Sequence, residues 1–195
     1  NQVVAAAQLG GNPFFATMFG EDDAADTLTR GLADAGVNIS KITRKPGFSS
    51  GKALIFVGLD GTNMIGIDAG ANEAFNASDV QTALSDIPQD AVMVVEMGLP
   101  VEACRAALES KGSRFLIFNP APVRVHLSEA EYRSIDIITP NETEAEELTG
   151  LKVTSVDEAF EAAKWLYSSG VAAVAITVDR EILDASRGLK WPEKQ

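Results

Sequence analysis

Cysteine, histidine and long apolar runs are scarce in this sequence of 195 residues, and each scarcity excludes a class of protein. The single cysteine, Cys104, excludes an internal disulfide and favours a reducing, cytoplasmic compartment. The single histidine, His126, has no second histidine, cysteine or serine motif beside it, so we interpret it as a surface residue. No apolar run approaches the roughly 18 residues that a membrane-spanning helix needs, so no membrane partner is expected.

Positive charge is also scarce. The sequence has 16 lysines and arginines against 28 aspartates and glutamates, which gives a net charge of −12. This charge argues against a nucleic-acid partner, because neutralising phosphates needs a basic surface, and it argues against an anionic membrane surface for the same reason. Small anionic ligands are still compatible with it, because the N-terminus of a helix binds them locally.

What the sequence does contain is a regular alternation of short apolar runs with amphipathic segments. We expect strands at residues 13–18, 52–57, 63–68, 91–96, 114–118, 135–139 and 171–177. We expect helices at residues 3–9, 21–35, 101–111 and 142–149, and further helices that begin near Ser78, Ser128 and Ser155. This order is typical of a doubly wound α/β fold, in which helices flank a mostly parallel sheet. Ligands in such folds bind beyond the carboxyl ends of the strands.

Some of the expected helices carry more specific local signals. Ser78 and Gln81 have the spacing of a capping box, and Pro100 is expected at the first position of the helix that follows it. In the helix after Ser155 the large apolar residues fall on one face and the charged residues on the other. The apolar face consists of Val156, Phe160, Ala163 and Tyr167.

The runs 52–57 and 63–68 interrupt the alternation, because no helical segment separates them. Between them Asp60-Gly61 is a hairpin signal. We therefore expect an antiparallel insertion that forms a small second sheet or a lid.

Three polar segments follow expected strands: Glu96–Pro100, Asn119–Pro122 and Pro140–Glu146. They are predicted to lie at the edge of the sheet formed by the carboxyl ends of its strands, where ligands bind. In the last segment Asn141 and Glu144 are three residues apart at a helix start, a spacing that favours a capping box. An amide and a carboxylate at a strand end can also hold hydrated Mg²⁺ near phosphates, and both interpretations can be true together. The two prolines of Asn119–Pro122 stiffen that segment, either as an exit from the strand or as a wall of the ligand site.

Other candidate groups have simpler explanations. Cys104 lies among alanines in an expected helix, so we interpret it as a packing residue. Glu21–Asp23 resembles a metal-binding cluster, but acidic residues are common in the first turn of a helix because they complement the helix dipole. The sequence contains no P-loop and no glycine-rich dinucleotide fingerprint.

Several motifs together resemble the ribokinase-like carbohydrate kinases, from Asn1 to about Thr177. The matching segments are Ala5–Gly10, Gly20–Asp22, Ala53–Val57, Ile65–Asn72, Phe118–Pro122, Thr139–Glu146 and Leu148–Gly150. The resemblance implies an incomplete ribokinase-like α/β domain at residues 1–177, with residues 52–68 as an inserted β-hairpin lid. A divergent polar tail is expected at residues 178–195.

The resemblance also implies an activity. Kinases of this family transfer a phosphoryl group from ATP to a sugar hydroxyl with Mg²⁺, and a monovalent cation is an additional candidate. The implied reaction is phosphorylation of ribose to ribose 5-phosphate, and the implied partners are the sugar, ATP and a second copy bound through the lid. Four residues are implied to contact the sugar, three of them from the lid: Asn1, Ala53, Ile55 and Ile67. The residues implied for the nucleotide are Asn141 and Thr177, and the residue implied for the metal is Glu144.

The sequence departs from the family pattern after the expected strand at residues 91–96. The family has Gln-Leu-Glu-Ile-Pro where this chain has Glu96-Met-Gly-Leu-Pro100, so Gly98 stands in place of a sugar-contacting glutamate. Glu96 is two residues away, and we do not expect it to reach the same point. This departure opens an alternative, a kinase for another sugar or for a nucleoside.

The family's Gly-Ala-Gly-Asp segment, whose aspartate is the catalytic base, is not found in this sequence, and neither is the glycine-rich turn that precedes the position of Asn1. We therefore assign no catalytic residue, and we expect a chain that is truncated at both ends and inactive alone. A non-catalytic binding or assembly module of the same fold is the remaining alternative.

Overall fold

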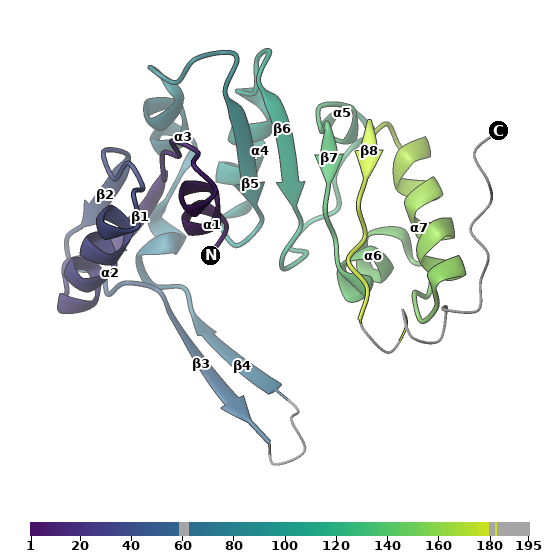
Figure 1. Ribbon diagram of the computed structural model, residues 1–195, viewed down its shortest axis with the longest axis horizontal. Coiled ribbons are helices and arrows are strands. Elements are labelled where there is room, and N and C mark those ends of the chain that lie inside the picture. The colour runs from purple at the N-terminus through teal and green to yellow at the C-terminus, as the bar shows by residue number, and fades with distance from the viewer. Residues whose placement is uncertain (59–62, 180–181, 183–195) are drawn as a thin grey trace. The chain divides into compact units, whose positions relative to one another are not determined.

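The structure is a computed structural model that describes residues 1–58, 63–179 and 182 (Figure 1). It contains two compact units, residues 1–86 and residues 87–195. The expected turn at Asp60-Gly61 and most of the expected tail at 178–195 lie outside the described residues. None of the helices in the described ranges is long and apolar enough to cross a bilayer.

The first unit is built from short helices and two separate pairs of strands. Its described elements are α1 (Gln2–Gln8), β1 (Thr17–Gly20), α2 (Asp23–Asp34), β2 (Ile42–Lys45), β3 (Lys52–Val57), β4 (Asn63–Asp68), the 3₁₀ helix η1 (Gly70–Ala74) and α3 (Ala77–Leu84). β1 and β2 pair in parallel, with Thr17 opposite Ile42. Helix α2 ends just before Gly36, whose φ of 84° lies in the left-handed region that favours glycine.

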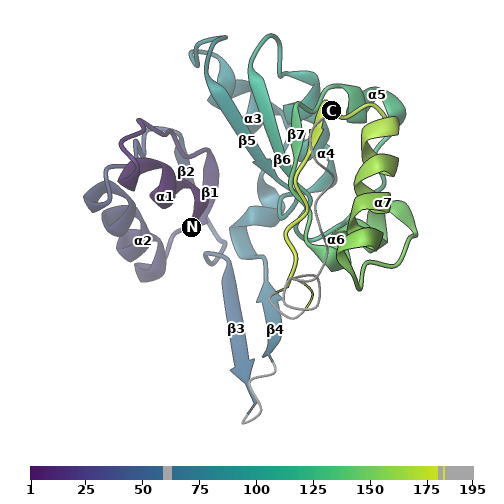
Figure 2. The same ribbon diagram turned by 45° about the vertical axis from the view of Figure 1, so that its right-hand side comes forward.

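The β3–β4 hairpin has the bounds that the sequence predicts. The strands pair antiparallel over their full length, from Lys52 opposite Asp68 to Val57 opposite Asn63. All side chains of β3 are exposed, and so are the described side chains of β4. The hairpin is therefore a two-stranded ribbon with exposed side chains on both of its faces. Figure 2 shows its strands β3 and β4 running beside each other.

The second unit is one parallel sheet with helices between its strands. Its described elements are β5 (Val92–Glu96), α4 (Val101–Glu109), β6 (Phe115–Asn119), α5 (Glu129–Arg133), β7 (Ile137–Ile138), α6 (Glu142–Thr149), α7 (Val156–Ser168) and β8 (Ala173–Val174). The strands lie in the order β5-β6-β7-β8, and every pair is parallel. The expected α/β fold with mostly parallel strands is therefore confirmed.

The core of the second unit lies on one face of β5 and β6. Buried and exposed side chains alternate along β5, where Met93 and Val95 are buried and Val94 is exposed. On β6 the side chains of Leu116 and Phe118 are fully buried. Burying an apolar side chain of this size contributes about 1.5–3 kcal/mol to folding, so this alternation fixes which face of the sheet the helices cover.

Helix α7 buries a different face from the one that the sequence predicts. Its buried residues are Ala159, Ala162 and Leu166, whereas Phe160 is 48% exposed and Tyr167 is 64% exposed. The prediction followed the largest apolar side chains, and it is wrong. The physical reason is that the two alanines are small enough for α7 to lie close against α6, where they join its buried cluster.

Some element starts also differ from the expectation. β1 begins at Thr17 and not at residue 13. The capping box of α3 is formed by Asn76 and Asp79, so Ser78 lies within the first turn and does not cap the helix. Pro100 is the N-cap residue of α4 and not its first helical residue. In each case the helix or strand type is as predicted, and the residue that begins or caps the element is not.

Candidate functional site

Hydrogen bonds between backbone groups join the segments that follow the strands of the second unit. The Met97 N–H, just after β5, donates to the Asn119 carbonyl oxygen at the end of β6, at 3.1 Å. The Thr177 N–H, after β8, donates to the Pro140 carbonyl oxygen, after β7, at 2.9 Å. The three polar segments and Thr177 therefore lie along the carboxyl edge of this sheet, which we call the ligand edge.

Asn141 and Glu144 form a complete capping box at the N-terminus of α6. The Glu144 N–H donates to Asn141 Oδ1 at 2.8 Å, and the Asn141 N–H donates to Glu144 Oε2 at 2.9 Å. The capping-box interpretation is therefore confirmed. The same two bonds hold both side chains in place at the ligand edge, because each side chain is tied to the backbone of the other residue.

A metal at this edge would depend on Glu144. Within the described residues, no group of three or more histidine, cysteine, aspartate or glutamate side chains is arranged to hold a metal ion. Mg²⁺ needs only one or two carboxylates and fills its other positions with water and substrate phosphates. A carboxylate oxygen that accepts one hydrogen bond keeps further lone pairs. Glu144 therefore fits a hydrated Mg²⁺ that phosphates also hold.

The Glu96 carboxylate, at the end of β5, folds back over Gly98. A Cβ atom added to Gly98 would lie 2.6 Å from Glu96 Oε2 and 3.0 Å from Oε1. The carboxylate thus lies directly beside the position of residue 98. The pKa of the Glu96 carboxyl is raised, mainly because the group is partly buried, and the Glu144 charge raises it further. The hydrogen bond from the Gly98 N–H and the Arg124 charge lower the pKa and offset part of this rise.

Cys104 is buried beside the same strand end. Its Sγ atom lies 3.7 Å from the Glu96 carbonyl oxygen and 3.8 Å from the Leu99 carbonyl oxygen. Burial, and then the Glu96 charge, raises the pKa of the thiol to about 11, so the thiol is protonated at neutral pH. Its expected packing role is confirmed, and His126 is exposed as expected.

The three lid residues that the resemblance assigns to the sugar share one face of the β3–β4 hairpin. Ala53 pairs directly with Ile67, and Ile55 is two residues further along the same strand, so its side chain projects from the same side. Ile65, opposite Ile55, completes this apolar face. Asn1 is the N-cap residue of α1, with an exposed side chain that makes no capping hydrogen bond.

Sequence reasoning missed how the start of the hairpin is held. Asp22, the N-cap residue of α2, accepts a hydrogen bond from the Ala25 N–H at 2.9 Å. It also accepts bonds from the Ser50 N–H and the Ser50 hydroxyl, each at 2.7 Å. The buried Ser50 Oγ in turn accepts the Gly20 N–H at 3.2 Å. The hydrogen bonds to Ser50, then the bond to Ala25, lower the pKa of Asp22 to about 2.

This arrangement, which we call the Asp22–Ser50 clamp, ties the segment before β3 to the end of β1. The acidic residues at the start of α2 are thus confirmed as helix-terminus residues. The only sequence signal for the clamp is an aspartate at a helix start, because Ser50 is 28 residues away in the chain.

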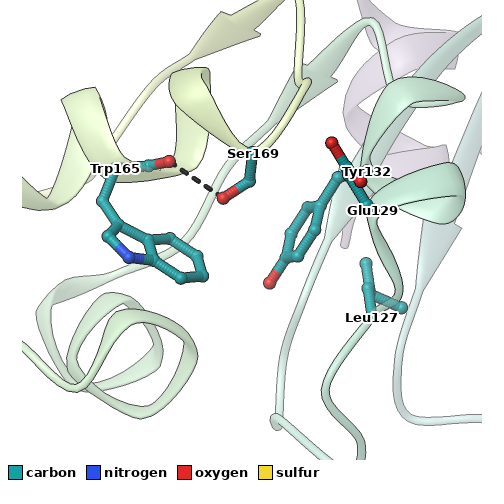
Figure 3. A pocket seen from close by; sticks show the side chains of 5 residues that line it. All are labelled: Leu127, Glu129, Tyr132, Trp165 and Ser169. Atoms are coloured by element: carbon teal, nitrogen blue, oxygen red, sulfur yellow. Dashed lines mark hydrogen bonds between the residues drawn. The ribbon is translucent and has the colours of Figure 1, made fainter.

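A shallow pocket of about 330 Å³ lies between α5 and α7 (Figure 3). Its lining residues are Leu127, Glu129, Tyr132, Trp165 and Ser169. The Tyr132 and Trp165 rings meet edge to face, with centroids 6.2 Å apart, and Ser169 donates to the Trp165 carbonyl oxygen at 3.0 Å. Tyr132 and Ser169 precede the amino ends of β7 and β8, so this pocket is not part of the ligand edge.

Comparison with known proteins decides the family. The sequence model of the pfkB family carbohydrate kinases matches residues 1–181 of this chain. The chain belongs to this family. The ribokinase-like fold is confirmed by the solved ribokinase of Thermotoga maritima, which superposes with a TM-score of 0.74 at 28% identity. That superposition covers 91% of this chain and 58% of the Thermotoga chain.

The names of the curated relatives refer to two different sugars, deoxyribose and ribose. The deoxyribokinase of Salmonella typhimurium is 33% identical over 180 residues, which are 91% of this chain and 59% of that protein. The ribokinase of Haemophilus influenzae is 32% identical over 189 residues, 96% of this chain and 61% of that protein. The chain therefore spans about three fifths of the length of these relatives.

Proposed function

We propose that this protein is a ribokinase-type carbohydrate kinase that transfers a phosphoryl group from ATP to ribose, giving ribose 5-phosphate and ADP. In this reaction a ribose hydroxyl loses its proton, its oxygen bonds to the γ-phosphorus, and the bond from that phosphorus to the β–γ bridging oxygen breaks. Family membership supports the class of reaction. The observation that carries the proposal is the ligand edge, where Asn141, Glu144 and Thr177 are gathered by hydrogen bonds.

In this proposal Asn141 and Thr177 bind the nucleotide and Glu144 holds Mg²⁺. The ion, when bound, neutralises charge on the phosphates. Asn141 offers an amide whose position is fixed by its bond to the Glu144 N–H. Thr177 offers a hydroxyl, and the bond to Pro140 anchors its backbone. Because these groups are already held in place, binding loses little free energy to ordering them.

The sugar is bound by Asn1 and by the lid face that carries Ala53, Ile55 and Ile67. That face is apolar and exposed in this structure. An apolar face against the sugar excludes water, which otherwise competes with the sugar hydroxyl for the phosphoryl group. In this proposal the lid, residues 52–68, is an insertion in one ribokinase-like domain at residues 1–177.

The opposite face of the hairpin is proposed to pair with a second copy of the protein. It carries Leu54, Phe56 and Met64, which are 64%, 62% and 73% exposed. A two-stranded hairpin is marginally stable by itself, and contiguous exposed apolar side chains mark an interaction surface. A homodimer formed through the lid covers this face and leaves the other face to the sugar. The single cysteine supports a cytoplasmic location for the protein.

Isothermal titration calorimetry with ATP tests the nucleotide half of the proposal. We expect saturable binding that is stronger with Mg²⁺ than without it. Glu144→Gln should abolish this Mg²⁺ dependence, and the control Glu147→Gln, exposed on the same helix, should leave it unchanged. Absence of ATP binding by the wild-type chain at about 1 mM ATP with Mg²⁺, the upper end of ordinary substrate affinities, would contradict the proposal.

A further inference from the structure

The Glu96 carboxylate occupies the space that a side chain at residue 98 would take, and the backbone conformation of Gly98 does not itself require glycine. Gly98 is not among the glycines with positive φ in the described chain. A Cβ atom at this position would lie 2.6 Å from Oε2, 3.0 Å from Oε1 and 3.1 Å from Cδ of Glu96. Any side chain at residue 98 would therefore force the Glu96 carboxylate out of the position that it holds.

The Glu96 carboxylate is held at the ligand edge and is still accessible. The Gly98 N–H donates a hydrogen bond to it, and the Arg124 guanidinium and the Glu144 carboxylate are close enough to act on its charge. Its side chain nevertheless keeps solvent-exposed surface. A ligand that lies against this edge can therefore reach the carboxylate without any rearrangement of β5.

The chemistry of the group limits what it can bind. In the proposed function Glu144 already supplies the carboxylate for Mg²⁺, and a carboxylate that holds no metal repels the phosphates of a nucleotide. The nucleotide is therefore not the partner of Glu96. A carboxylate accepts hydrogen bonds from hydroxyl groups, and its two oxygens match two hydroxyls on neighbouring carbons. In phosphoryl transfer the acceptor must lie next to the transferred group, which places the sugar at the same edge as the Mg²⁺ carboxylate.

We propose that Glu96 is a specificity-determining residue of the acceptor site, whose carboxylate, held over Gly98, accepts hydrogen bonds from a pair of neighbouring hydroxyl groups on the sugar. This inference rests on the proposed kinase function. In this proposal the role of Glu96 depends on Gly98, because the absence of a side chain at residue 98 leaves the space that the Glu96 carboxylate occupies. The proposal also predicts the sugar class: a pentose with a vicinal diol is bound in preference to its 2-deoxy counterpart.

The test is calorimetric titration of the 195-residue chain with ribose and, separately, with 2-deoxyribose. The wild-type chain should bind ribose at least roughly tenfold more tightly, which is the usual effect of losing one hydrogen bond to a charged group. Glu96→Gln and Gly98→Ala should each weaken ribose binding by roughly 10- to 100-fold and leave 2-deoxyribose binding within about threefold. The control Glu109→Gln removes the same charge from the far end of α4 and should change neither.

The outcomes separate this inference from the proposed function. If the wild-type chain binds ribose and the two variants bind both sugars as the wild type does, Glu96 does not contact the sugar. A variant that weakens both sugars equally also overturns the inference, because a structural role moves both affinities together. If ATP binds but the wild-type chain binds neither sugar, the proposed function itself is wrong. Circular dichroism and thermal melting of each variant verify that it is folded before it is titrated.

Discussion

Replacing Gly20 with alanine should displace the segment from which the lid begins. A Cβ atom on Gly20 would lie 2.2, 2.5 and 2.6 Å from three backbone atoms of residues 48–50. Rotation of a side chain cannot relieve contacts with backbone atoms, so the segment itself must move and the Asp22–Ser50 clamp must open. Overpacking of this kind costs about 1–3 kcal/mol, and the broken hydrogen bonds of the buried Ser50 add about 1–3 kcal/mol. The free energy of unfolding should therefore fall by about 2–6 kcal/mol.

Helix α2 offers a matched control. A Cβ atom on Gly31 has no neighbouring atom within 4 Å, so Gly31→Ala should raise the free energy of unfolding by about 0.5–1 kcal/mol through helix propensity. Urea denaturation followed by far-ultraviolet circular dichroism measures both variants. If Gly20→Ala does not fold, Ser50→Ala, with an expected loss of about 1–3 kcal/mol, tests the same clamp. The reasoning is refuted if Gly20→Ala or Ser50→Ala unfolds within about 0.5 kcal/mol of the wild type.

Asp22, Leu166 and Asn141 each have a role that a single substitution can test. Because the folded-state pKa of Asp22 is about 2, below its ordinary value of 3.8, its ionised form stabilises the fold above about pH 4 and loses this effect as the pH falls towards 2. The difference in unfolding free energy between the wild type and Asp22→Asn should thus shrink below about pH 4, and a difference that does not change with pH would contradict this. Leu166→Ala, which truncates a fully buried side chain, should lower the free energy of unfolding by about 2–5 kcal/mol. Phe160→Ala, which truncates a half-exposed side chain, should lower it by less than about 1 kcal/mol. Urea denaturation measures both variants, and equal losses would mean that the buried face of α7 is wrongly assigned. Asn141→Asp keeps a residue that caps helices well, so the free energy of unfolding should stay within about 0.5 kcal/mol of the wild type. Calorimetry should show weaker ATP binding by this variant. Unchanged ATP binding would mean that Asn141 is not part of the nucleotide site.

The parts of the fold that depend on local sequence could be predicted. The hairpin bounds follow from two apolar runs around Asp60-Gly61, and the capping box of Asn141 and Glu144 follows from their spacing, because both features involve near neighbours in the chain. Strand β2 was not predicted, because Ile42–Lys45 carries two basic residues and has no alternation that marks a strand. Its identity as a strand comes from pairing with β1.

The parts of the candidate site that depend on distant contacts could not be predicted. Spacing alone does not show that Ser50 reaches back to Asp22, or that α7 uses its small residues to approach α6. The sequence does show that Gly98 departs from the family pattern. Only the structure shows that the Glu96 carboxylate fills the space this glycine leaves, because the spacing of the residues does not show that the carboxylate accepts a hydrogen bond from the Gly98 N–H.

Hydrogen–deuterium exchange of the chain with and without ribose tests the central claim most directly, because it reports the sugar site residue by residue. The account predicts that ribose, in the presence of ATP and Mg²⁺, slows exchange in β3 and β4 and in the segment from Glu96 to Gly98. The pocket between α5 and α7 is an internal control, in which exchange should not change. Exchange that is unaffected by ribose in the hairpin and at the end of β5, or that slows only between α5 and α7, would contradict the account.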